Sequence, residues 1–416
     1  MLYDAYEVQR SFLAGASKLA GLGAGWLTNP ANPLAYASTS PLVAASLEVF
    51  AHATAPHGKP EFGIRSVKIG PSTGSGQAKD VAVREEIVLR KPFGQLKRFV
   101  RKGVDTGPRL LIVAPMSGHY ATLLRGTVER MLPGHDVYIT DWRDAKLVPE
   151  SDGAFDLDDY IDYLIEFLET IGERTGERPH VIAVCQPAVP AFAATALMNA
   201  DKAKWRPKTL TMMGGPIDTR KAPTAVNTLA TQRPLSWFRQ NVVATVPAIY
   251  PGAGRQVYPG FLQLAGFMAM NLGDHLVSHW EMYKHLVVGD EESADATRDF
   301  YDEYRSVCDM TAEFYLQTVE AVFQKHLLPK GKLTHRGRRV DPKAITDTAL
   351  LAIEGERDDI SGLGQTRAAL GLAVKLPEAK KRYFMAEGAG HYGIFNGRKW
   401  REKIAPVVED WIAKNG

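Results

Sequence analysis

Residues 180–200 read HVIAVCQPAVPAFAATALMNA, and this stretch decides the fold. Its beginning, HVIAV, is a short apolar run without polar alternation, which is typical of a strand buried on both faces of a sheet. The alanine-rich remainder predicts a helix with Pro187 in its first turn, where a missing N–H group costs little. Cys185 therefore lies on a strand-to-helix turn. The helix end favours a thiolate and supplies N–H donors, whereas the alternative is an inert buried cysteine, as most free cysteines are.

The segments around this turn repeat the order of strand and helix. Apolar runs predict further strands at 110–115, 135–142, 209–215, 348–355 and 381–388, preceded by two strand patterns, VAVREEIVLR and LKRFVRK. Helices are expected at 121–132 and 157–173. Buried strands that alternate with helices indicate an α/β fold, with a mostly parallel sheet flanked by helices.

A long aromatic-rich segment interrupts this alternation and predicts an inserted helical cap. Most of its aromatic side chains are expected in the cap's own core, and some could line a cleft. The expected organisation is an N-terminal helical extension at 1–60, the first part of the core at 61–215, a helical cap or lid at 216–343 and the second part of the core at 344–416.

An acid and a histidine follow later strands in the order that an α/β-hydrolase site requires, which is nucleophile, acid, histidine. Asp358 follows the strand predicted at 348–355, and His391 lies in a Gly-rich loop after the last strand. Asp359 is an alternative acid, and either aspartate could instead cap a turn. The order predicts an α/β-hydrolase fold with Cys185, Asp358 and His391 as the catalytic triad of an acyl-transfer site.

Two backbone N–H groups are expected to form the oxyanion hole of this site. One belongs to Gln186, directly after the nucleophile, and the other comes from the loop after an earlier strand. The sequence LLIVAPMSGHY at 110–120 offers the N–H group of Met116 or Ser117 there, and Met116 is preferred.

The composition is that of an ordinary globular protein and excludes disordered and fibrous classes, with 45% hydrophobic and 23% charged residues and a mean hydropathy of −0.18. A net charge of +3 is too small to predict a nucleic-acid partner. Two cysteines cannot form a disulfide framework or a multi-thiolate metal site, and they suit a reducing compartment. We expect no metal, no cofactor, no secretion signal and no transmembrane segment, so the cytoplasm is the default location.

Five motifs together resemble the intracellular poly(3-hydroxybutyrate) depolymerases. They are AVCQPAVPA (183–191), VAPMSGHYATLLRGT (113–127), YITDWRDA (138–145), FYDEYRSVCDMTAEFYLQTV (300–319) and GAGHYGIFNG (388–397). The resemblance spans nearly the whole chain. It implies hydrolysis of stored amorphous polyester on cytoplasmic granules by a cysteine nucleophile, and it places Cys185, Asp358 and His391 in the triad.

The resemblance leaves other functions to be weighed. Related polyester synthases carry a GxCxGG turn, whereas Ala183 and Pro187 flank Cys185 here, and this departure favours hydrolysis. The alternatives are a synthase-like or thiolytic transacylase, which passes the acyl group to a hydroxyl or to coenzyme A, and an inactive granule-coating protein. The sequence leaves the oligomeric state open.

Three further features are weaker candidates for function. GPSTG at 70–74 matches the GxSxG serine pattern, but no helix follows it, so Ser72 is rejected as a nucleophile. Cys308 lies in a helical pattern and is expected to be a core thiol. The segment 325–339 holds six Lys or Arg residues and no acidic residue. It is expected to be a solvated loop, with contact to phosphate or to a granule surface as the alternative.

Overall fold

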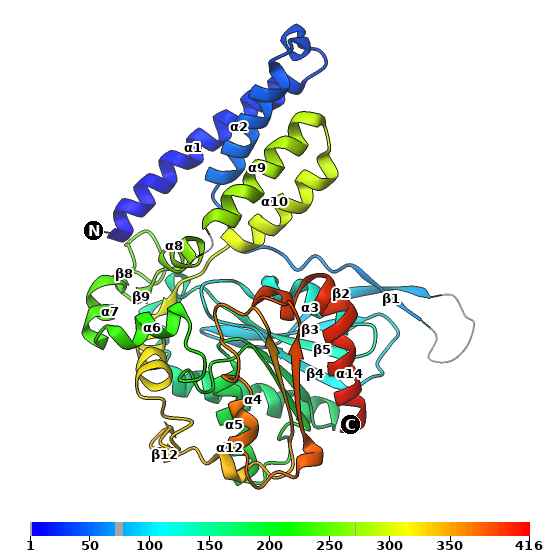
Figure 1. Ribbon diagram of the computed structural model, residues 1–416, viewed down its shortest axis with the longest axis vertical. Coiled ribbons are helices and arrows are strands. Elements are labelled where there is room, and N and C mark those ends of the chain that lie inside the picture. The colour runs from blue at the N-terminus through cyan, green and yellow to red at the C-terminus, as the bar shows by residue number, and fades with distance from the viewer. Residues whose placement is uncertain (1, 71–77, 271) are drawn as a thin grey trace.

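A nine-stranded sheet forms the centre of the computed structural model, which describes residues 2–70, 78–270 and 272–416 (Figure 1). The strands are β1 (Ser66–Ile69), β2 (Lys79–Lys91), β3 (Gly94–Arg101), β4 (Arg109–Val113), β5 (Asp136–Trp142), β6 (His180–Val184), β7 (Thr209–Met213), β13 (Ala349–Gly355) and β14 (Lys381–Ala386). Their order in the sheet is β1-β2-β3-β5-β4-β6-β7-β13-β14. The strands predicted between 110 and 388 are therefore confirmed, while Ser72 lies outside the described residues.

The six strands from β5 to β14 run parallel, and β1, β2 and β3 extend the sheet in antiparallel fashion. Every residue of β4, β6, β7 and β13 is buried, because helices cover both faces. Helices α3 (Arg125–Met131) and α14 (Ala405–Lys414) lie together on one face, joined by a bidentate ion pair between Arg130 and Glu409 (Figure 1). Helices α4 (Leu157–Thr175), α5 (Ala188–Ala200) and α12 (Ala368–Leu372) cover the other.

Helix α4 is an example of a helix whose start, end and buried face follow from its local sequence. Asp156 and Asp159 form a capping box at its start, and Gly176 ends it with a φ of +72°. Its buried face carries Tyr160, Phe167 and other apolar residues at helical spacing. The strand order, the parallel core and the helices on both faces are those of an α/β-hydrolase fold, which confirms the predicted fold class.

The segment between β7 and β13 is mostly helical. It contains α6 (Ala225–Gln232), α7 (Leu235–Asn241), α8 (Gly260–Met270), α9 (Leu272–Val288), α10 (Glu291–Arg305) and α11 (Ala312–Thr318). It also contains a small sheet that was not predicted, in which β8 (Ala244–Thr245), β9 (Gln256–Tyr258) and β10 (Met310–Thr311) pair in the order β10-β9-β8. These strands of two or three residues are too short to leave a hydrophobic period in the sequence.

Four helices form a projection that stands out from the hydrolase body (Figure 1). The chain begins with a hairpin of α1 (Leu2–Thr28) and α2 (Ser40–Thr54), and α2 packs against α9, which is paired with α10. We call α1, α2, α9 and α10 the helical projection. Segments that the sequence assigned separately to the N-terminal extension and to the cap thus share one unit. Within the described residues, no helix combines the length and the apolar character needed to cross a membrane.

Residues 325–339 form a largely solvated connection, as predicted, whose basic side chains are exposed. It also contains a short hairpin of β11 (Thr334–His335) and β12 (Arg338–Arg339) that was not predicted. The hairpin's arginines pair with acids of the body, Arg336 with Asp159 and Asp162, and Arg338 with Asp201. The helical pattern predicted around Cys308 is wrong, because α10 ends at Arg305 and the cysteine lies in the loop before β10.

Candidate active site

Cys185 lies at the end of β6 in a backbone conformation that few side chains adopt. Its φ is +66°, in the left-handed region. Its N–H group donates to the carbonyl of Met213 on β7 at 2.7 Å, and the Cys185 carbonyl accepts from the N–H group of Ala188 at 3.0 Å. The residue therefore occupies the strained strand-to-helix turn that presents a nucleophile above the sheet.

The turn is made without the two glycines that usually flank such a nucleophile. Ala183 is fully buried, and Pro187 caps α5 with a φ of −57°, which suits the proline ring. The space comes instead from Gly215, which follows the neighbouring strand. A Cβ atom on Gly215 would lie 2.1 Å from the Cβ of Ala188 and 3.0 Å from the Cys185 carbonyl oxygen.

His391 and Asp358 form a buried pair at the same edge of the sheet. The Nδ1 atom of His391 lies 2.8 Å and 3.0 Å from the two carboxylate oxygens of Asp358, and the histidine is 5% exposed. Asp358 Oδ1 also accepts from the backbone N–H groups of Ile360 at 2.9 Å and Ser361 at 2.8 Å. Asp359 is exposed. Asp358 is thus the acid that contacts the histidine.

Two glycines missed by the sequence reasoning allow this approach. A Cβ atom on Gly214 would lie 3.1 Å from both Asp358 Oδ2 and His391 Cε1. One on Gly355 would lie 2.5 Å from the carbonyl oxygen of Ala389, in the loop that carries His391. The available signal was the position of these glycines at the ends of predicted strands, where a close approach of two chain segments requires a missing side chain.

The charges around His391 favour its protonated form. Burial lowers the pKa of its imidazole, but Cys185 and Asp358 oppose burial through charge and hydrogen bonds, and together they raise the pKa well above its ordinary value. Cys185 and Asp358 both hydrogen-bond the ring. The structure therefore brings Cys185, His391 and Asp358 together, with the histidine ring between the thiol and the carboxylate.

The two expected oxyanion donors also lie at this site, with one unexpected contact between them. The N–H group of Met116 donates to the side-chain Oε1 of Gln186 at 3.1 Å. The backbone N–H group of Gln186 lies just before α5, and Ser117 lines the neighbouring cavity. The Gln186 carboxamide thus accepts from the Met116 N–H group, which an oxyanion would need as a donor.

A cavity of about 380 Å³ opens beside Cys185 and His391. Cap residues form much of its wall, with Val226 and Leu229 on α6 and the aromatic side chains of Phe238, Tyr258 and Tyr315. The lining is largely apolar, which suits an uncharged ligand of low polarity. Cap aromatics were expected mainly in the cap's own core, and these three contribute to the cleft.

The second cysteine of the chain, Cys308, is a buried residue. Its Sγ donates weakly to the carbonyl of His119 at 3.6 Å, so Cys308 is a core thiol as predicted. In the part of the chain that the structure describes, no three His, Cys, Asp or Glu side chains are grouped to hold a metal ion.

Comparison with protein families matches residues 214–416 to the family described as "PHB de-polymerase C-terminus". This segment contains the cap, Asp358 and His391. No curated protein is significantly similar in sequence to the chain.

Solved structures similar to this chain include hydrolases of several kinds. A soluble variant of monoglyceride lipase from Saccharomyces cerevisiae shares 12% identity with a TM-score of 0.47, over 83% of this chain and 99% of the lipase. The esterase from Thermogutta terrifontis shares 13% identity with a TM-score of 0.40, over 84% of this chain and 98% of the esterase. The 2-hydroxy-6-oxo-6-phenylhexa-2,4-dienoate hydrolase from Rhodococcus sp. strain RHA1 shares 12% identity with a TM-score of 0.43, over 80% and 99%.

Proposed function

We propose that this chain, whose residues 214–416 match the PHB depolymerase family, hydrolyses poly(3-hydroxybutyrate) through a triad of Cys185, His391 and Asp358. The observation that carries the proposal is the left-handed conformation of Cys185 beside the buried His391–Asp358 pair. A nucleophile, a base and an orienting acid are the parts that acyl transfer needs. The family match over residues 214–416 supports the polyester as the substrate.

In the first half of the reaction, the Cys185 thiolate attacks the carbonyl carbon of an ester in the polymer. The carbonyl π electrons move to oxygen, and the resulting oxyanion is held by the N–H groups of Gln186 and Met116. Each such donor is worth about 3 kcal/mol of transition-state stabilisation. The C–O bond to the leaving chain then breaks, His391 gives its Nε2 proton to the departing alkoxide, and a thioester on Cys185 is left.

In the second half, a water molecule attacks the thioester carbonyl while His391 accepts its proton. The tetrahedral species collapses, the C–S bond breaks, and the acid product leaves with Cys185 again a thiolate beside protonated His391. Asp358 keeps Nδ1 of the imidazole bound, so the reacting Nε2 faces the nucleophile throughout.

One hydrogen bond in the site must break before the reaction can begin. Met116 N–H is bound to the Gln186 side chain at 3.1 Å, so the carboxamide must turn aside when the substrate carbonyl oxygen enters. The backbone N–H group of Gln186 needs no such change. The apolar cavity beside Cys185 then holds the neighbouring part of the polyester.

Location follows from the substrate. A polymer of this kind is insoluble, so the enzyme acts at the surface of stored polyester granules in the cytoplasm, and the products are 3-hydroxybutyrate oligomers and monomers. The competing functions are transfer of the acyl group to coenzyme A or to a hydroxyl group, and an inactive granule-coating protein.

Product analysis on amorphous poly(3-hydroxybutyrate) particles tests the proposal. Wild-type protein is expected to release 3-hydroxybutyrate oligomers or monomers without coenzyme A, and Cys185→Ala is expected to release none above background. Iodoacetamide is expected to label Cys185 and to spare Cys308, which is 1% exposed. Release that requires coenzyme A would favour thiolysis, and undiminished release by Cys185→Ala would remove the mechanism.

A further inference from the structure

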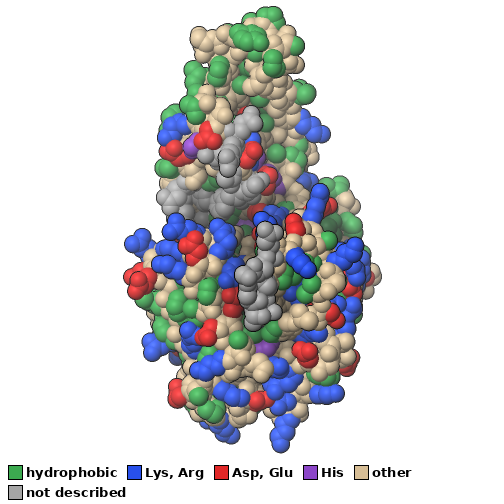
Figure 2. Space-filling view, turned by 90° about the vertical axis from the view of Figure 1, so that its right-hand side faces the viewer, with side chains coloured by type: hydrophobic (Ala, Val, Ile, Leu, Met, Phe, Trp, Pro, Cys, Tyr) green, Lys and Arg blue, Asp and Glu red, His purple; other side chains and the backbone are tan. Residues whose placement is uncertain are grey.

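The far end of the helical projection carries no charged side chain. Residues 19–47 contain no Asp, Glu, Lys, Arg or His, and Lys18 and Glu48 bracket them. This run covers the end of α1, the turn and the start of α2. Figure 2 shows the end of the projection with green and tan atoms, while blue and red atoms gather lower down. Surfaces of soluble proteins normally mix both charges over such a length.

Large apolar side chains are exposed along this end. On α1 they follow helical spacing and form a single stripe, in which Phe12 is 75% exposed, Leu19 and Leu22 are 72% exposed and Trp26 is 54% exposed. The stripe continues over the turn and onto α2 with Leu34, Tyr36, Leu42 and Val43. Scattered apolar residues are normal on a surface, but a contiguous set marks an interaction site.

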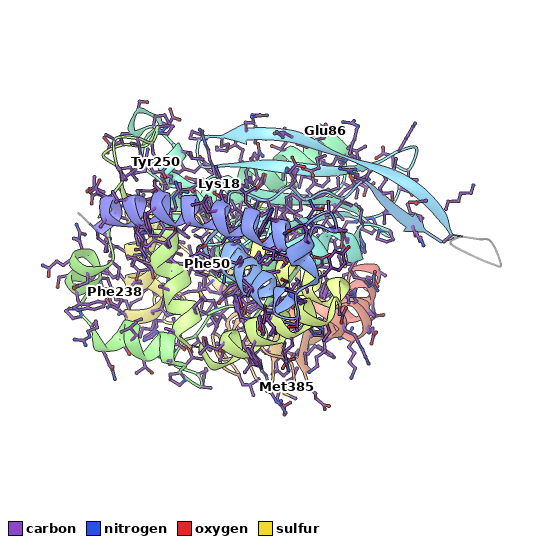
Figure 3. The ribbon with its side chains drawn as sticks, turned by 90° about the horizontal axis from the view of Figure 1, so that it is seen from above. Lys18, Phe50, Glu86, Phe238, Tyr250 and Met385 are labelled. Carbon is purple, nitrogen blue, oxygen red and sulfur yellow. The ribbon has the colours of Figure 1, made fainter. Side chains whose placement is uncertain are left out.

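Small residues on the packed sides of α1 and α2 explain why the large apolar side chains face outward. Ala20 and Ala24 of α1 and Ala44 and Ala45 of α2 are buried, and α1 packs closely along α2. A Cβ atom on Gly23 would lie 3.1 Å from Cδ1 of Leu47 on α2, so the backbones approach closely. Figure 3 shows Lys18 on α1 and Phe50 on the adjacent α2. With small side chains filling the inner face, the large apolar ones have no space there.

The root of the projection is anchored to the body near the cavity. The Tyr3 hydroxyl donates to Asp309 at 2.5 Å, and the Tyr6 ring stacks on Phe261 of α8 with a centroid distance of 3.8 Å. Helix α8 also supplies Gln263 to the lining of the active-site cavity. The projection and the cavity entrance are therefore joined through one helix.

We propose that the uncharged end of the helical projection, residues 19–47 with the α1 stripe, docks the enzyme on the neutral apolar surface of solid polyester. This inference rests on the proposed function for the identity of the polymer. Trp26 and Tyr36 combine an apolar ring with one polar group, which suits a boundary between water and an apolar phase. Anionic lipid attracts clusters of Lys and Arg, and this end has none.

Adsorption to amorphous poly(3-hydroxybutyrate) particles, measured by co-sedimentation, tests the docking. Leu22→Lys with Trp26→Lys is expected to weaken the apparent affinity at least about tenfold, because two apolar side chains lose their burial against the polymer. Gln9→Lys with Ser11→Lys adds the same charge to exposed polar positions nearer the root and is expected to stay within twofold of wild type. Unchanged adsorption in the first variant would overturn the proposal.

Two further measurements test whether lipid or a second copy of the chain binds this surface instead. Wild-type protein is expected to bind phosphatidylcholine vesicles at least about tenfold more weakly than polymer particles, and binding as strong as to polymer would assign the surface to lipid instead. Sedimentation equilibrium is expected to give the same mass for wild type and Leu22→Lys/Trp26→Lys. A dimer that the substitutions dissociate would assign the stripe to a second copy and overturn the docking role.

A soluble 3-hydroxybutyrate oligomer separates docking from catalysis. The lysine variant is expected to cleave this oligomer at the wild-type rate and polymer particles more slowly. Wild-type protein that cleaves neither substrate would defeat the proposed function. Wild-type protein that cleaves the oligomer, together with a lysine variant that degrades particles at full rate, would defeat only the docking proposal.

Discussion

His391 lies against Cys185, and a single carboxylate, that of Asp358, holds the Nδ1 atom of its ring. We expect Asp358→Asn to lower kcat on a soluble ester on the order of 10⁴-fold, as the same change of the orienting acid does in serine triads. Asp359→Asn is the matched control, since it makes the same change at the neighbouring aspartate, whose side chain is exposed. The measurement is steady-state hydrolysis at constant pH. A similar loss in both variants would show that general charge in this loop matters, rather than the contact to Nδ1.

Gly215 is the residue that replaces the missing glycines of the nucleophile turn. Gly215→Ala would place a Cβ 2.1 Å from the Cβ of Ala188, so β7 and α5 must separate. We expect a loss of about 1–3 kcal/mol in the free energy of unfolding, the usual range for overpacking, with a larger loss of activity than of folded protein.

Denaturant unfolding and soluble-ester hydrolysis measure these two effects. Gly371→Ala in α12 is the control, because no atom lies within 4 Å of its new Cβ and its φ is not positive. That variant is expected to keep full activity, with unchanged or slightly raised stability. Full activity in Gly215→Ala would show that the turn does not depend on this space.

Among the elements, the root of α1 meets the cap at a buried acid. Asp309 accepts from Tyr3 and from the N–H group of Gly260 at the start of α8, and its backbone N–H donates to Asp144. Burial, followed by the charge of Asp144, raises the pKa of Asp309 to about 7, although Lys146 opposes the shift. The carboxyl group of the folded protein therefore keeps its proton where that of the unfolded chain has lost it.

This difference sets a pH dependence of stability with a definite sign. The contribution of Asp309 is fully present below pH 4 and is lost as the pH rises through about 7. Asp309→Asn keeps an acceptor for Gly260 and removes the titration. We expect the free energy of unfolding to fall less between pH 4.5 and 7 in this variant than in wild type, as measured by urea titration. Parallel pH profiles of the two proteins would contradict the assignment.

The elements of the core were predictable because each carries its own signal. Buried apolar runs located β4, β5, β6, β7, β13 and β14, and chain order then assigned Cys185, Asp358 and His391 to one edge of the sheet. The small cap sheet and the bond from Met116 to the Gln186 side chain were not predictable. They depend on contacts between segments far apart in sequence, and short strands or single rotamers leave no periodic pattern.

At the scale of the whole molecule, charge and apolar surface are separated. Basic side chains of the body pair with acids, as Arg336 does with Asp159 and Asp162, while the uncharged run lies at the end of the projection. The N-terminal helices read as a separate extension in the sequence, because nothing local reports that α2 packs on α9. Because α1 and α2 pack with the cap helices, the apolar extension is part of the helical projection, whose root lies near the active-site cavity.

This separation predicts how adsorption to polymer responds to salt. Ion pairing between a protein and a charged surface weakens as dissolved ions screen the charges. Burial of apolar area is not weakened in this way, and sulfate strengthens apolar burial. We expect the affinity for poly(3-hydroxybutyrate) particles to be unchanged within twofold between 50 and 500 mM sodium chloride and to rise in sodium sulfate. Lys18→Gln removes the one charge between residues 11 and 47 and is expected to adsorb as wild type does. A steep fall with sodium chloride would instead assign adsorption to the basic side chains of the body, and the projection would then have no part in holding the enzyme on its substrate.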